Sequence, residues 1–142
     1  MTRKAYKLLA KHFFSLGKEE HAFAHIFLVL DWCLMKRAEN CVNAKINHIY
    51  FRKDSLVFEF AKSKGLQKGE DHVGPWHLYA NPDQPYICPV LALARYLACN
   101  PDVLKGDMPL FEGSSQYDRY VSIFDKTCCI ELKDELKALG YE

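Results

Sequence analysis

The segment at residues 22–34 constrains the fold more than any other part of the chain, because it predicts a helix that is apolar on nearly every side. Only His25 and Asp31 interrupt its apolar residues, which recur at helical spacing. A helix of this kind has to be covered by other elements. We therefore expect a central helix over about residues 19–36. Its apolar run is shorter than the ~20 residues of a membrane span, so we expect an intracellular globular protein without membrane contact.

A second helix is predicted at the start of the chain. Thr2 is a suitable N-cap for a helix that runs to about Phe14. The apolar face that we expect for this helix consists of Leu8, Leu9, Phe13 and Phe14.

Three short segments in the middle of the chain predict a small antiparallel sheet. Residues 48–52 and 56–60 alternate between apolar and polar side chains, and Asp54-Ser55 is expected to form the tight turn between them. Residues 76–79 predict a third strand.

Two more helices are predicted after the sheet. Pro89 suits the first turn of a helix that ends near Cys99, and a last helix is expected over residues 115–139 with Gly140 as its C-cap. The residues that we expect to be buried in the helix from Pro89 are Val90, Leu91, Leu93, Ala94 and Leu97.

The predicted fold is mainly α with a small three-stranded antiparallel β-sheet (α+β). A length of 142 residues suits one domain or part of one. We expect helices in residues 1–45, the hairpin and third strand in residues 46–80, and helices again in residues 86–142.

Charge is distributed unevenly along the chain, although its net value is only +1. Residues 1–69 contain 13 Lys and Arg against 6 Asp and Glu, and residues 70–142 contain 6 against 12. A basic half of this kind favours a phosphate backbone as its partner. Lys4, Lys7 and Lys11 of the first helix are expected to contact DNA.

The cysteines predict free thiols rather than disulfides or a zinc site. Four of the six lie in apolar helical patterns, and no C-x-x-C pair occurs. A reducing compartment fits this usage. His21 and His25 have helical metal-ligand spacing but no second ligand pair, so we expect no metal. A thiol- or metal-dependent enzyme built on Cys128 and Cys129 is a weaker third hypothesis.

Four separated stretches share their residue types and spacing with one known family. They are Arg37-Ala38-Glu39-Asn40 with residues 46–49 after it, the basic segment 60–69, residues 77–82, and residues 88–94. Together they resemble the N-terminal part of a tyrosine recombinase (phage-integrase-like) catalytic domain, in particular its eukaryotic, transposon-derived branch often called Crypton-like. The resemblance covers roughly residues 22–96.

The resemblance implies that Arg37 clamps a DNA phosphate and that a hairpin lysine, Lys62 or Lys64, is the general acid. An arginine fork donates two parallel hydrogen bonds and stays charged, and a lysine on a turn can deliver a proton. Counting along the strands favours Lys62, whereas the Ser-Lys-Gly context favours Lys64, so both are kept. The resemblance also implies an acidic or polar residue that orients Arg37, and Glu39 or the neighbouring Asn40 is expected to fill this place. The structural alternative for Arg37 is an ion pair or a cation at a helix C-terminus.

The second half of the family's active site has no counterpart in this sequence. No histidine follows His77, so the His-x-x-Arg box is missing, and Tyr141 lacks the helical context of the tyrosine nucleophile. His77 is expected to be a strand residue packed beside Trp76 rather than a proton donor. The chain ends about where the box would begin, which predicts a truncated, inactive product.

The resulting hypothesis is a truncated tyrosine recombinase or integrase-like domain, part of a DNA breaking-rejoining catalytic domain, that binds double-stranded DNA in the nucleus. Its parent would act in DNA integration and recombination through a phosphotyrosine intermediate, without cofactor or metal. For the full-length parent, a homo-oligomer assembled on DNA is an additional expectation. The alternative is a non-enzymatic interaction module of a domesticated transposon, or a DNA-binding scaffold, whose acidic second half docks a partner.

Overall fold

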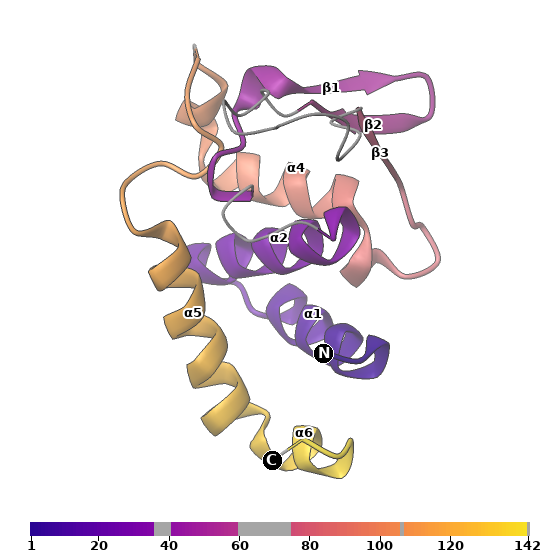
Figure 1. Ribbon diagram of the computed structural model, residues 1–142, viewed down its shortest axis with the longest axis vertical. Helices are drawn as coiled ribbons and strands as arrows, with labels where there is room; N and C mark the ends of the chain where they lie inside the picture. Colours follow the sequence, from indigo (N-terminus) through magenta and orange to yellow (C-terminus); the bar gives the residue numbers. More distant parts are fainter. Residues whose placement is uncertain (36–40, 60–74, 106, 142) are drawn as a thin grey trace, which may run out of the picture.

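A computed structural model of the protein describes residues 1–35, 41–59, 75–105 and 107–141. This part of the chain is mainly helical with one small antiparallel sheet at one end of the helices, which confirms the predicted α+β class (Figure 1). The α-helices are α1 (Arg3–Ser15), α2 (Glu19–Leu34), α4 (Pro89–Cys99), α5 (Gln116–Lys126) and α6 (Lys133–Ala138). The strands are β1 (Ile49–Arg52), β2 (Ser55–Phe58) and β3 (Trp76–Tyr79), and short 3-10 turns lie at Ile46–His48, Pro85–Ile87 and Pro101–Leu104.

Helix α2 is the central element, as predicted. It packs against α1, α4 and α5, and in Figure 1 the sheet, α4, α2 and α1 follow one another as layers with α5 along their side. Every α2 residue from Ala22 to Leu30 is buried, including His25. The helix ends at Leu34, and Met35 caps it in the left-handed conformation with φ 47°. Lys36, the predicted last residue of this helix, lies outside the described residues.

Aromatic rings join α2 to the later helices and form the middle of the core. The Phe27 ring stacks on Tyr120 of α5 at 4.3 Å, and Phe23 meets Phe111 edge-on at 5.5 Å. The Tyr96 hydroxyl donates to the Leu110 carbonyl at 2.8 Å, which satisfies this buried polar group. Such ring pairs add about 0.5–1.5 kcal/mol each beyond the burial of their area.

The sheet has the order β1-β2-β3, with antiparallel pairing throughout. All four residues of the central strand β2 are buried. The hairpin turn lies one residue earlier than predicted, because Lys53 takes the left-handed conformation (φ 55°) and Ser55 already pairs with Arg52. The Ser55 hydroxyl donates to the Arg52 carbonyl at 3.3 Å and closes the turn.

Helix α4 has the predicted bounds, but its predicted buried face is wrong in part: Leu93 is buried and Val90 and Leu97 are half-buried against the core, as expected, whereas two other residues are not. Its buried residues are Pro89, Ala92, Leu93 and Tyr96, whereas Leu91 is 38% exposed and Ala94 is exposed. The prediction counted only aliphatic residues as inside. The Tyr96 ring belongs to the core because its hydroxyl finds an acceptor there, and its burial rotates Leu91 and Ala94 outward.

The predicted single C-terminal helix is wrong, because the segment is broken into three pieces. After α5 comes a π-helical turn, Thr127–Glu131, in which the Leu132 backbone N–H donates to the Thr127 carbonyl at 2.8 Å. Leu132 then leaves helical geometry, and α6 begins at Lys133. Gly140, with φ 87°, ends α6 as predicted, since its N–H donates to Lys137 and that of Tyr141 donates to Leu136. We call residues 116–141 the C-terminal arm.

Candidate nucleic-acid interface

Three lysines of α1 form the described part of the predicted DNA-binding surface. Lys4 and Lys11 are exposed and Lys7 is half-buried. Spacings of three and four residues place them on one side of the helix, and we call them the lysine stripe. Among the described residues, no carboxylate lies within ion-pair distance of any of the three. Their charge is therefore available to an external anion.

The side of α1 that packs on the core determines which side of the helix, and therefore which lysines, face outward. The buried residues of the helix are Ala5, Tyr6, Leu9, Ala10 and Phe13. The predicted apolar face is therefore wrong in part, because Leu8 and Phe14 are only half-buried. The Thr2 hydroxyl accepts from the Ala5 N–H at 3.3 Å, which confirms the predicted cap. No acidic residue lies in the first turn, so the positive end of the helix dipole adds to the lysine charge.

A hollow of about 390 Å³ lies beside the start of α1. We call it the Arg3 hollow, and its walls come from the N-terminal end of α1, the C-terminal end of α2, and β3 with the turn that follows. Arg3 stands one helical turn before Lys7, so the hollow adjoins the lysine stripe. The lining residues are Arg3, Tyr6, Trp32, Cys33, Met35, His77, Leu78, Tyr79, Asn81, Ile87 and Pro89.

The lining of the Arg3 hollow combines positive charge with aromatic rings. It contains no carboxylate among the described residues. The Tyr6 and Trp32 rings stack at 4.3 Å with 7° between their planes, and Tyr79 is 59% exposed. Burial raises the pKa of the Cys33 thiol to about 11, so this group stays neutral. An arginine beside exposed aromatic surface suits contact with a phosphate and its sugar.

His77 lies on β3 as predicted, but it does not pack beside Trp76. The strand register pairs His77 with Val57 and Trp76 with Phe58, so the two side chains lie on opposite faces of the sheet. The His77 Nδ1 lies 2.9 Å from the Ser55 hydroxyl oxygen, and the residue is exposed. The prediction of a strand position is confirmed, whereas the expected packing is wrong.

The predicted phosphate clamp and its partners lie outside the described residues. This applies to Arg37, Glu39, Lys62 and Lys64. Met35, two residues before Arg37 in the sequence, is 91% exposed and lines the Arg3 hollow. Arg3 itself was missed by the sequence prediction, although its position beside Lys4 and one turn before Lys7 was a usable signal.

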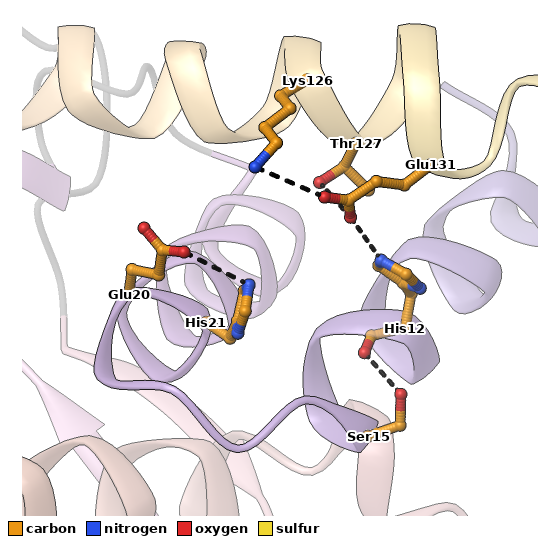
Figure 2. Close-up of polar contacts among 7 residues, drawn as sticks. All are labelled: His12, Ser15, Glu20, His21, Lys126, Thr127 and Glu131. Carbon is orange, nitrogen blue, oxygen red and sulfur yellow. Dashed lines mark hydrogen bonds and ion pairs between the residues drawn. The ribbon is translucent and has the colours of Figure 1, made fainter.

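A separate polar cluster ties the C-terminal arm to α1 (Figure 2). One oxygen of Glu131 lies 2.7 Å from His12 Nε2 and 3.4 Å from the Thr127 hydroxyl, and the other lies 3.9 Å from Lys126 Nζ. The hydrogen bond from His12 is the main reason why the pKa of Glu131 lies below its ordinary value. Since the Ser15 hydroxyl donates to the His12 carbonyl and not to its ring, the cluster is no serine-histidine-glutamate relay.

Two other groups that could support catalysis have pKa values that burial shifts away from neutral pH. The His25 ring donates from Nε2 to the Tyr86 carbonyl at 2.7 Å, and burial lowers the pKa of His25 to about 4. Burial also raises the pKa of Cys128 to about 11, which makes it a poor nucleophile at neutral pH. Among the described residues, no three His, Cys, Asp or Glu side chains gather closely enough to hold a metal ion.

The chain gives no match to protein-family models, to curated proteins or to solved structures. None of the helices within the described ranges is long and apolar enough to cross a membrane. The candidate interface is therefore characterised by its own geometry, which consists of the lysine stripe and the adjoining Arg3 hollow.

Proposed function

We propose that this protein binds the phosphate backbone of double-stranded DNA as a tyrosine-recombinase-like domain that does not complete strand cleavage. The observation that carries the proposal is the lysine stripe, since three lysines share one face of α1 without a carboxylate partner among the described residues. Exposed cations of this kind bind DNA by displacing condensed counterions, without reading its sequence.

The Arg3 hollow supports the same proposal. It places Arg3 of α1 beside the C-terminal end of α2, which leads in sequence to Arg37. In the proposal, Arg37 clamps one phosphate while Glu39 orients it, and Lys62 or Lys64 contacts the same strand. The sequence contains no His-x-x-Arg box. We therefore assign the chain DNA binding in the nucleus and leave integration and recombination to its proposed transposon-derived parent.

A salt titration of DNA binding tests the proposal. Fluorescence anisotropy of a labelled duplex would be measured with the wild type and with Lys4→Gln, Lys7→Gln and Lys11→Gln combined. Each phosphate contact contributes about 0.9 to the magnitude of the slope of log affinity against log salt. The magnitude of this slope is therefore expected to be smaller by up to about 2.7 in the triple variant. The matched control, Lys105→Gln with Lys133→Gln and Lys137→Gln, removes the same charge elsewhere and is expected to keep the slope.

The contrary result would be equal slopes for the wild type and the stripe variant. A loss of the same size in both triple variants would also contradict the proposal, because it would show an effect of net charge alone.

One observation favours the alternative of a non-enzymatic interaction module. The C-terminal arm exposes large apolar side chains, namely Tyr117, Ile130 and Leu139. A module of this class would show no DNA affinity at moderate salt, so the same titration separates the two functions.

A further inference from the structure

A second and larger concavity lies between α1 and the C-terminal arm. This C-terminal groove has a volume of about 770 Å³, within the ~300–1,000 Å³ typical of small-molecule sites. Ala5 and Leu9 of α1 form one wall, and Phe124 and Leu136 of the arm form the other. Met1 and Tyr141, from the two ends of the chain, also line the groove. The Tyr141 hydroxyl accepts from the Thr2 N–H at 2.5 Å. The groove is thus a largely apolar channel, and the N-terminal and C-terminal segments of the chain are hydrogen-bonded to each other beside it.

The charged side chains along the groove all have the same sign. Lys133 and Lys137 line it from α6, and both are exposed. They stand four residues apart, so they lie on one side of the helix. No carboxylate occurs among the described lining residues. An apolar channel with two cations at its edge is complementary to a ligand that has an apolar tail and an anionic head.

The π-helical turn contributes directly to the groove. Cys128 and Cys129 are lining residues, and both belong to the turn. Turns of this type are rare and are frequently found at functional sites. The turn is held by the contact between Glu131 and His12 at 2.7 Å, which joins it to the same helix that forms the opposite wall (Figure 2). The contact therefore joins the two walls of the groove.

We propose that the C-terminal groove binds an anionic amphiphile, a molecule with a carboxylate head and an unbranched apolar tail such as a fatty acid. The tail lies between α1 and the arm, and the head contacts Lys133 and Lys137. This site is separate from the lysine stripe and does not depend on the proposed DNA binding.

Isothermal titration calorimetry with octanoate, decanoate and dodecanoate below their micelle concentrations tests the proposal. We expect one saturable site, with affinity rising up to about fourfold for each added methylene group. Lys133→Gln with Lys137→Gln is expected to weaken decanoate binding about fivefold or more while leaving decanol binding unchanged. The matched control, Lys53→Gln with Lys105→Gln, removes two lysines away from the groove and is expected to bind decanoate as the wild type does.

A second variant tests the position of the tail. Cys129 is exposed, so Cys129→Trp places a bulky ring in the groove without disturbing the core. It is expected to abolish the binding of both decanoate and decanol.

Three results would overturn the proposal. The first is no saturable decanoate binding. The second is equal affinity for decanoate and decyltrimethylammonium, since the lysines would then select nothing. The third is a dimer in sedimentation that Cys129→Trp dissociates, which would assign the groove to a second copy of the chain.

Discussion

The α1–α2 pair and the C-terminal arm are built on different principles. Helix α2 is buried along most of its length among aromatic and aliphatic side chains, and α1 covers one of its sides. The arm buries few residues, contains a π-helical turn, and is tied to α1 by polar contacts from Glu131 and Tyr141. Burial of this extent makes the stability of the α1–α2 pair insensitive to salt. The exposed polar contacts of the arm contribute little stability, and their contribution depends on pH.

The largest expected effect is in the core. Phe27→Ala removes a ring with no exposed surface that contacts Phe23, Phe111 and Tyr120. We expect a loss of about 3–5 kcal/mol in the free energy of unfolding, measured by urea denaturation. The matched substitution in the arm is Tyr117→Ala, whose side chain is 48% exposed, and it is expected to change stability by less than about 0.5 kcal/mol. Similar losses of unfolding free energy for both variants would contradict the proposed difference between the buried core and the arm.

The second effect is the response of the core to acid. Burial lowers the pKa of His25 from 6.5 to about 4, so the unfolded chain takes up a proton that the folded chain excludes. The contribution of His25 to stability is therefore constant above pH 6.5 and falls between pH 6.5 and 4, by roughly 2–3 kcal/mol at pH 4.5. His25→Gln keeps a donor for the Tyr86 carbonyl and is expected to remove this dependence. Denaturation curves at pH 7.5 and 4.5 measure it, and an unchanged pH profile in the variant would refute the assignment to His25.

The third effect compares one glycine from each region. Gly140 ends α6 with φ 87°, and a Cβ there would meet no atom within 4 Å, so Gly140→Ala is expected to cost about 1 kcal/mol through backbone conformation alone. A Cβ at Gly17, between α1 and α2, would also meet no atom within 4 Å, but the φ angle of Gly17 is not positive. Gly17→Ala is therefore expected to be neutral or to stabilise by up to about 1 kcal/mol. Thermal unfolding of the two variants checks the difference in sign.

The smallest effect is in the polar contact of the arm. The pKa of Glu131 is lowered mainly by the hydrogen bond from His12, so its contribution is present at neutral pH and is lost as the pH falls below about 4.5. Glu131→Gln is expected to speed amide hydrogen exchange in α6 by up to about fivefold at pH 7. Exchange in α2 is the internal control and is expected to stay unchanged. An equal change in both helices would mean that the arm does not open separately.

The elements with strong local signals were predictable from sequence. Thr2 as a cap, β3 and the bounds of α4 are confirmed, because capping chemistry, alternation and Pro89 act within a few residues. The π-helical turn and the contact between His12 and Glu131 had no such signal, since the latter joins positions 119 residues apart. Tyr96 was not among the residues expected to be buried in its helix, because only the fold supplies an acceptor for its hydroxyl.

The candidate interface was predictable in part. Lys4 and Lys11 are exposed as a DNA-binding surface requires, because a helix with one buried face turns the residues opposite to it outward. The contribution of Arg3, His77 and Tyr79 to one hollow depends on how α1 and β3 pack, which local pattern does not encode. The roles of Arg37, Glu39, Lys62 and Lys64 remain sequence predictions.

The most direct test of the account is the salt dependence of DNA binding by Arg37→Ala beside the wild type, with Arg52→Ala as a control. Arg52 is an exposed hairpin residue outside the proposed interface. We predict that Arg37→Ala lowers the affinity for a duplex and reduces the salt slope by about 1, while Arg52→Ala changes neither and both variants keep the unfolding midpoint of the wild type. A wild-type protein without salt-dependent affinity, or an Arg37→Ala variant that binds as the wild type does, would contradict the account.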